Sequence, residues 1–352
     1  MITVSLCMIV KNEERTLSRC LDTVADLVEE IVIVDTGSTD GTLEVARQYT
    51  DRIWSVPWTD DFAAARNAAF DRATMEYCLW LDADDVLEPE DRARFRALKE
   101  GLSPDTDVVM LPYRAGGGED GLVYYRERLI RRGAGLRWEG AVHEVITPVG
   151  RVEYGDAAVT HRRTGSGDPD RNLRIYQGLL SRGHVLTPRE QYYYARELLG
   201  HGLDKAAAEQ LEAFLERPEG WWVDRRQACL ELGGCYERLG RTEDAFRALT
   251  RGLRFGPPGA ELCCALGWFF LAREELPGAV YWYERALECP RRDSEGSFVH
   301  PDCYGYIPWL QLCVCWYRLG DRARAEACNE AAGALKPQGS AYLRNRAFFK
   351  TV

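Results

Sequence analysis

The stretch that decides the fold is LWLDADDVL at residues 79–87. Its apolar start predicts a buried strand. The carboxylates of Asp82, Asp84 and Asp85 follow where the chain leaves that strand. Ligands of open α/β sheets bind outside the carboxyl ends of the strands, and carboxylate oxygens are the ligands that Mg²⁺ or Mn²⁺ prefers. The stretch predicts a site for a divalent metal and a diphosphate; the plainer alternative is an acidic turn that caps the next helix.

Short apolar segments alternate with helical ones through the first 160 residues. Strands are expected at 2–10, 29–35, 52–56, 77–81 and 107–113, and helices at 13–25, 41–49 and 61–73. This alternation predicts βαβ units that form a largely parallel sheet.

The second half of the chain has an almost entirely helical pattern with an internal repeat. Residues 237–257 resemble residues 317–337, and Ala245 and Ala279 stand 34 positions apart, which is the tetratricopeptide period. About four helix pairs should therefore stack as a short solenoid, whose curved face usually binds a partner. The expected regions are an α/β domain at 1–165, a linker and connecting helix at 166–190, and the repeat domain at 191–352.

Bulk composition excludes several classes of protein. The chain has 352 residues, 46% of them hydrophobic, which suits two domains with sizeable cores. A net charge of -10 argues against a nucleic-acid or anionic-membrane partner. The 12 cysteines show no zinc-type CxxC pair, and free thiols in a reducing cytosol are the simplest account. No apolar run approaches the roughly 18 residues of a membrane span, so a cytoplasmic protein is expected.

A second polar turn follows the strand that ends at Asp35, in the sequence VDTGSTDGT at 34–42. This is not the Gly-x-Gly-x-x-Gly fingerprint, so the sequence does not support a nicotinamide site. An acidic residue at a strand end suits a nucleoside, because it can accept a hydrogen bond from a base N–H or a ribose hydroxyl. The alternative is an ordinary turn in which Asp40 caps a helix.

Four motifs together resemble a known family. KNEE at 11–14, VDTGSTDGT at 34–42, FAAARN at 62–67 and LDADD at 81–85 resemble, in this order, a family 2 glycosyltransferase of the GT-A fold. Their pairing with tetratricopeptide repeats resembles the sublancin-type S-glycosyltransferases of glycopeptide bacteriocins. The expected fold class is therefore α/β: a GT-A, Rossmann-like nucleotide-sugar-binding domain followed by an all-α tetratricopeptide-repeat solenoid.

The resemblance implies a nucleotide-sugar donor, a divalent metal (Mg²⁺ or Mn²⁺) and inversion at the anomeric carbon. Asp84 matches the metal-binding aspartate of the family. Asp82 would face the ribose or the sugar, and Asp85 would be a second contact with the donor. His161 fits the late histidine that serves as a further metal ligand.

Other donor contacts are implied by the same resemblance. Asp35 matches the aspartate that contacts the nucleobase. Arg66 and Asn67 match an Arg-Asn pair near the diphosphate or the sugar. Arg126 and Arg128 are candidates for diphosphate contact, although an arginine-rich solvated face is the alternative.

The general base should come from the stretch WEGAVHEV at 138–145. Glu144 is the expected base, because the family places a carboxylate in a loop facing the sugar, and His143 is its rival. A thiol acceptor would need less help from a base, because cysteine ionises near pH 8.5.

The sublancin-type relatives imply UDP-glucose or UDP-N-acetylglucosamine as donor, a Cys or Ser acceptor in a peptide or protein, and a homodimer. Two alternatives stay open. The acceptor could be a lipid-linked or polysaccharide molecule, or the chain could be a tetratricopeptide scaffold with an inactive glycosyltransferase-like domain.

Overall fold

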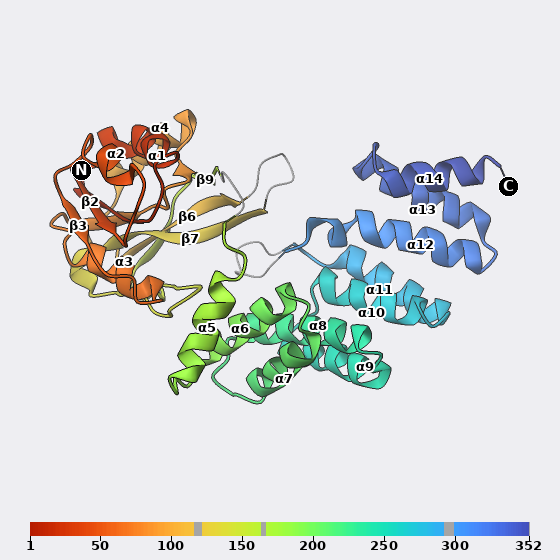
Figure 1. The fold of residues 1–352 in the computed structure, drawn as a ribbon. Helices are drawn as coiled ribbons and strands as arrows, with labels where there is room; N and C mark the ends of the chain where they lie inside the picture. Colours follow the sequence, from red (N-terminus) through yellow and green to blue (C-terminus); the bar gives the residue numbers. More distant parts are fainter. Residues whose placement is uncertain (116–121, 163–166, 292–298, 352) are drawn as a thin grey trace. The chain divides into compact units, whose positions relative to one another are not determined.

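The computed structural model describes residues 1–115, 122–162, 167–291 and 299–351, and it divides into two compact units (Figure 1). The first is Met1–Val185 and the second is Leu186–Val352. The predicted connecting region 166–190 spans this boundary, and its helix belongs to the first unit. In the described part of the chain, none of the helices has the length and apolar character needed to cross a bilayer.

The first unit is built on one mixed sheet with the strand order β3-β2-β1-β4-β7-β6-β9-β5, in which β8 pairs with β6. Its strands are β1 (Val4–Val10), β2 (Glu30–Asp35), β3 (Ile53–Ser55), β4 (Tyr77–Trp80), β5 (Asp85–Val86), β6 (Val108–Ala115), β7 (Leu122–Arg131), β8 (Val152–Tyr154) and β9 (Val159–His161). Strands β1 to β4 pair in parallel, as predicted. The pairings β6–β8 and β6–β9 are parallel too, and the antiparallel pairings are β4–β7, β6–β7 and β5–β9, so the sheet is mixed with a parallel majority among its described strands.

Helices cover both faces of the sheet (Figure 1). They are α1 (Leu17–Val24), α2 (Thr42–Ala46), α3 (Phe62–Phe70) and α4 (Pro89–Gly101). Helix α5 (Arg171–Ser181) follows the last strand in the chain and is not part of either sheet core. Alternate residues of a strand point to opposite faces. Leu6 and Met8 of β1 accordingly pack in the core that α1, α2 and α4 share, whereas Cys7 packs with α3 on the other face.

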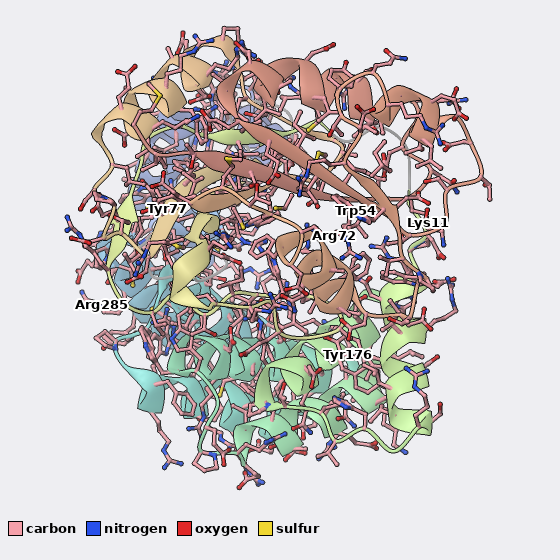
Figure 2. All side chains as sticks on the ribbon, turned by 90° about the vertical axis from the view of Figure 1, so that its left-hand side faces the viewer. Lys11, Trp54, Arg72, Tyr77, Tyr176 and Arg285 are labelled. Atoms are coloured by element: carbon pink, nitrogen blue, oxygen red, sulfur yellow. The ribbon has the colours of Figure 1, made fainter. Side chains whose placement is uncertain are left out.

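The short outer strand β3 is held by cation–π contacts. Its Trp54 ring lies 5.4 Å from the guanidinium carbons of both Arg52 and Arg72, and Figure 2 labels Trp54 and Arg72. Arg72 follows α3, so these contacts tie the end of that helix to the sheet and help to set the orientation of α3.

The regular structure of the second unit is helical throughout the residues described, 186–291 and 299–351. It consists of α6 (Pro188–Gly200), α7 (Asp204–Leu215), α8 (Trp222–Arg238), α9 (Thr242–Arg251), α10 (Ala260–Leu271), α11 (Leu276–Glu288), α12 (Tyr306–Arg318), α13 (Arg322–Leu335) and α14 (Ser340–Phe349). Consecutive helices pack as four pairs from α6 to α13, which confirms the predicted number.

The repeat seen in the sequence has a packing reason. Ala245 and Ala279 are both fully buried in the second helices of their pairs. In the first helices, a Cβ at Gly233 would lie 2.6 Å from Leu249, and one at Gly267 would lie 2.9 Å from Tyr283. Small residues recur at the tetratricopeptide period because the two helices of each pair approach closely at these points.

Asp224 of α8 makes the stability of the helical unit depend on pH. Burial raises the pKa of this carboxyl from 3.8 to about 6, although Arg189 and Arg196 act in the opposite direction. The folded state then holds the proton more tightly than the unfolded state, so the contribution of Asp224 to stability is fully present below about pH 4 and is lost as the pH rises through about 6. We expect Asp224→Asn to raise the free energy of unfolding at pH 8 by about 1–3 kcal/mol.

Thermal unfolding of the full chain at pH 4 and pH 8 tests this expectation. The exposed variant Glu219→Gln is the matched control and should change neither midpoint. If Asp224→Asn raises the unfolding midpoint as much at pH 4 as at pH 8, ionisation of Asp224 is not the cause of the stabilisation.

Candidate functional site

Sheet pairing brings the aspartate cluster and a distant histidine together. Strands β5 and β9 run antiparallel, with Asp85 opposite His161. The backbone N–H of Arg162 donates to the carbonyl oxygen of Asp84 at 2.8 Å. The predicted partnership of Asp84 with His161 therefore has a structural basis in the register of one short strand pair.

Asp84, Asp85 and His161 form a group that could hold a metal ion, since one ligand atom from each lies within 4.8 Å of the others. Nδ1 of His161 lies 3.5 Å from Oδ1 of Asp84 and 3.5 Å from Oδ1 of Asp85. Among the described residues, Nδ1 of His161 and Oδ1 of Asp85 are buried without a hydrogen-bond partner. Buried polar atoms normally have a partner, so this donor set fits a divalent cation.

The crowding of negative charge at the cluster also favours a bound cation. Burial raises the pKa of Asp84, and the carboxylates of Asp82 and Asp85 raise it further, while His161 partly offsets them. Like charges that crowd together in this way are stabilised when a cation binds between them.

Arg128 lies behind the aspartate cluster and is not among the residues that line the cavity, so its predicted contact with the diphosphate stays a prediction. Its side chain is 1% exposed, and Nη1 donates to Oδ2 of Asp85 at 3.1 Å. The guanidinium stacks 3.8 Å from the Trp80 ring. Oδ2 of Asp85 also accepts from the backbone N–H of Asp82, so the pair Arg128–Asp85 supports the turn that carries the cluster.

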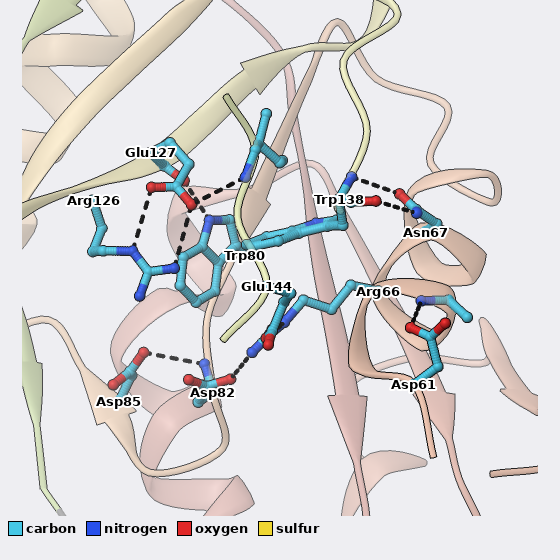
Figure 3. A network of polar contacts seen from close by, with 12 residues as sticks. Asp61, Arg66, Asn67, Trp80, Asp82, Asp85, Arg126, Glu127, Trp138 and Glu144 are labelled. Carbon is cyan, nitrogen blue, oxygen red and sulfur yellow. Dashed lines mark hydrogen bonds and ion pairs between the residues drawn. The ribbon is translucent and has the colours of Figure 1, made fainter. Parts of the chain in front are cut away.

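Arg66 joins the donor side of the site to the proposed base (Figure 3). Its Nη2 donates to Oδ1 of Asp82 at 2.7 Å, and its Nε donates to Oε1 of Glu144 at 2.7 Å. The guanidinium lies between the rings of Trp80 and Trp138, 4.7 and 5.0 Å from their centroids. The two carboxylates raise the pKa of Arg66 by more than burial lowers it, so the group stays charged.

Asn67 has a structural contact, and its predicted place beside the donor stays a prediction. Its Nδ2 donates to the carbonyl oxygen of Trp138 at 2.9 Å, and its Oδ1 accepts from the backbone N–H of Trp138 at 3.0 Å (Figure 3). Both ends of the amide are thereby used to fix the segment that leads to His143 and Glu144.

A cavity of about 470 Å³ lies in front of these groups. It is lined by Ile9, Val10, Lys11, Glu13, Thr36, Trp58, Phe62, Arg66, Trp80, Asp82, Ala83, Asp84, Arg126, Val142, His143, Glu144, His161, Arg171 and Asn172. The predicted residues Asp82, Asp84, Glu144, His143 and His161 thus meet in one cavity. Its size suits part or all of a nucleotide-sugar.

Backbone strain also concentrates around this cavity. Asn12, Asp60 and His143 have φ angles of 58°, 59° and 53°, a region that residues other than glycine seldom occupy. His143 lines the cavity, and the other two are close in sequence to lining residues. Strained residues cluster at functional sites, which supports the cavity as the working site of this unit.

Asp35 is buried and serves its own turn, since its carboxylate accepts backbone N–H groups of Gly37 and Ser38 at 3.1 and 3.0 Å. Its neighbour Thr36 lines the cavity instead. The predicted contact of Asp35 with a nucleobase stays a prediction. Glu13, from the KNEE motif, lines the cavity too, and burial together with Asp84 raises the pKa of its carboxyl.

Sequence reasoning missed one wall of the cavity. Trp58 lies just before α3, and Phe62 is the first residue of that helix. On the same side of the cavity, Arg171 and Asn172 are the first two residues of α5. The two α5 residues fall in a stretch that reads as a polar linker, so only their unusual density of charge could have marked them. Phe62 is the first residue of the motif FAAARN at 62–67 and Trp58 precedes the motif, and neither had a periodic signal of its own.

Comparison with known proteins identifies the class of this unit. Residues 5–152 match the family described as Glycosyl transferase family 2. A TPR repeat-containing protein of Synechococcus elongatus is 29% identical over 299 residues, which cover 82% of this chain and 67% of the relative. The lipopolysaccharide core biosynthesis glycosyltransferase LpsC of Rhizobium meliloti is 35% identical over 47% of this chain and 62% of its own length.

The SPbeta prophage-derived glycosyltransferase SunS of Bacillus subtilis is 30% identical over 40% of this chain and 34% of its own length. This chain therefore spans between about a third and two thirds of the length of the curated relatives named here. Among solved structures, glucosyl-3-phosphoglycerate synthase of Mycobacterium tuberculosis, crystallised with Mn²⁺ and UDP-glucose, aligns with a TM-score of 0.38 at 16% identity, over 53% of this chain and 81% of that one. A MamA protein aligns with a TM-score of 0.38 at 18% identity, over 48% and 82%.

The first unit is a family 2 glycosyltransferase domain of the GT-A fold, as its family match and parallel strands β3-β2-β1-β4 indicate. The unit that follows it is a tetratricopeptide-repeat region. The chain thus joins a glycosyltransferase domain to a helical repeat unit, and part of it is similar to SunS.

Proposed function

We propose that this chain is an inverting glycosyltransferase that moves glucose or N-acetylglucosamine from a UDP-sugar to an acceptor. The observation that carries the proposal is the meeting of Asp84, His161 and Glu144 in one cavity, with Arg66 between the two sides. Nucleotide-sugar transfer needs a cation site for the leaving diphosphate and a base on the opposite face of the sugar, and this cavity offers groups for both.

Each residue has a proposed part in the transfer. Asp84 and His161 would hold Mg²⁺ or Mn²⁺, with Asp85 behind them, and the bound ion supplies charge stabilisation for the departing nucleoside diphosphate. Arg126 lines the cavity and adds a second positive group there. Glu144 takes the proton of the acceptor as the acceptor attacks the anomeric carbon, and Arg66 keeps Glu144 in place. A single displacement then inverts the configuration.

The proposed acceptor is a Cys or Ser side chain of a peptide or protein, gripped by the repeat unit. Support comes from the architecture, because tetratricopeptide solenoids present an extended concave surface for partners. Exposed aromatic side chains such as Trp268, Tyr281 and Tyr317 are available on that unit. A homodimer in the cytoplasm is part of the same proposal.

A second candidate acceptor is a lipid-linked saccharide or polysaccharide. The observation that favours it is the 35% identity to a relative named for lipopolysaccharide core biosynthesis, which exceeds the identity to SunS. An inactive scaffold is disfavoured by the complete set of polar groups in the cavity.

Assays on the full chain and on a chain ending at Val185 test the proposal. We expect both to hydrolyse UDP-glucose or UDP-N-acetylglucosamine slowly with Mn²⁺, and EDTA to abolish the reaction in both. Only the full chain should add a sugar to members of a Cys- and Ser-containing peptide library, read out by mass spectrometry. Modification of a lipopolysaccharide core oligosaccharide but no peptide would favour the second candidate, and absence of both hydrolysis and UDP binding would favour the scaffold.

A further inference from the structure

Helix α5 adds a wall to the cavity that the family match at residues 5–152 does not include. Arg171 is the first residue of α5, and it lines the cavity with Asn172. The helix is anchored by Tyr176, whose buried hydroxyl donates to the carbonyl oxygen of Val142 at 3.4 Å. Val142 directly precedes His143 and Glu144, so α5 is tied to the loop that carries the proposed base.

The guanidinium of Arg171 is held against an aromatic pair. Its central carbon lies 4.7 Å from the centroid of the Phe62 ring, and the edge-on Trp58 ring lies 4.7 Å from the same centroid. Phe62 is fixed in turn, because its backbone N–H donates to the carbonyl oxygen of Ala141 at 2.9 Å. A cation over an aromatic face is attracted by the electrons of the ring, which biases Arg171 towards this position.

Arg171 differs in charge environment from the other arginines of the cavity. Arg66 is paired with Asp82 and Glu144, and Arg126 is paired with Glu127 at 3.3 Å. Within the part of the chain that the structure describes, no carboxylate forms an ion pair with Arg171 within 4.0 Å. Its neighbour Asp168 is engaged with Arg174. The start of α5 adds the positive end of a helix dipole at the same place.

We infer that Arg171 binds an anionic group, phosphate or carboxylate, of a molecule held in the cavity. Nε of Arg171 donates to Oδ1 of Asn172 at 3.4 Å, and Nη1 and Nη2 form no hydrogen bond among the described residues. A planar guanidinium that is already oriented by stacking can present these two nitrogens to such a group. The inference rests on the proposed function, and it specifies that one of the two substrates presents an anionic group to Arg171. The anion belongs either to the diphosphate of the donor or to an acidic group near the nucleophile of the acceptor.

Calorimetry on the full chain with Mn²⁺ separates the two sources. The variant is Arg171→Gln, and the control is Arg174→Gln, an exposed arginine one turn further along α5. The probes are UDP and uridine, followed by glucose 6-phosphate, glucuronate and glucose added to the UDP-bound protein. If the anion is the diphosphate, Arg171→Gln weakens UDP binding about 10-fold and leaves uridine binding unchanged.

If the anion belongs to the acceptor, UDP affinity is unchanged, but wild type prefers glucose 6-phosphate or glucuronate to glucose and Arg171→Gln loses that preference. Identical affinities of wild type and Arg171→Gln for every probe overturn the inference, as does an equal effect of Arg174→Gln. A wild type that binds no UDP refutes the proposed donor, and the sugar probes without UDP then still decide whether Arg171 binds an anion.

Discussion

Asp84→Asn is expected to abolish Mn²⁺-dependent binding of UDP and to lower sugar transfer by at least about 1,000-fold. Asp84 is the carboxylate of the cluster that reaches both the cavity and His161, because its side chain is 27% exposed and lies 3.5 Å from Nδ1. Asp85 has Oδ2 paired with Arg128 and does not line the cavity, so it offers a cation only its buried Oδ1 and does not replace Asp84 on the cavity side. The substitution keeps the shape of the side chain and removes the charge that a hard cation needs.

The measurement is calorimetry of UDP with and without Mn²⁺ on wild type and Asp84→Asn, next to thermal unfolding of both. Asp105→Asn, at an exposed position of the same unit, is the control and should behave as wild type. The folded state of Asp84→Asn should be at least as stable as that of wild type, since burial and like charges raise the pKa of Asp84. Mn²⁺-dependent UDP binding that survives in Asp84→Asn would refute the metal role of Asp84.

Glu144→Gln is expected to cut turnover by about 100- to 10,000-fold while the affinity for UDP changes little. The side chain of Glu144 is 12% exposed and is held by Nε of Arg66 at 2.7 Å. Glutamine retains an oxygen that can accept this hydrogen bond, so the geometry around Arg66 and Asp82 should persist. What is lost is the ability to take a proton from the acceptor.

His143 is the rival base, and a parallel variant decides between the two. His143→Asn is the appropriate substitution, because asparagine tolerates the positive φ of 53° at this position better than most residues. We expect initial rates with saturating donor to fall strongly in Glu144→Gln and only modestly in His143→Asn. The reverse order would move the role of base to His143.

The sequence predicted well those strands and helices whose formation depends only on residues close together in the chain. Tyr77 to Trp80 form the buried strand expected from their apolar character, and Asp82, Asp84 and Asp85 follow it as predicted. The helical repeat was visible because close helix packing demands small residues at fixed intervals, as at Gly233 and Gly267. The sheet was harder to predict: β7 inserts antiparallel beside β4, and no local pattern distinguishes a parallel neighbour from an antiparallel one.

For individual site residues, the direction of the side chain decides which of the predicted residues reach the cavity. Arg126 and Arg128 lie two apart on β7, yet Arg126 lines the cavity and Arg128 is buried against Asp85. A shift in the pairing of β6 with β7 at Val109 and Met110 lies beside this stretch, and such irregularities re-aim side chains. Asn67 follows Arg66 in sequence but points to Trp138, because neighbouring residues on a helix face different directions.

The sequence by itself determined that a nucleotide-type α/β unit precedes a helical repeat and that acidic groups gather where β4 ends. These features depend on hydrophobic periodicity and on residues next to each other in the chain. Only the tertiary structure decided that His161 meets Asp84, that Arg66 joins Asp82 to Glu144, and that α5 brings Arg171 to the cavity. Those contacts join residues far apart in sequence, and they depend on strand register and helix packing, which the whole core sets together.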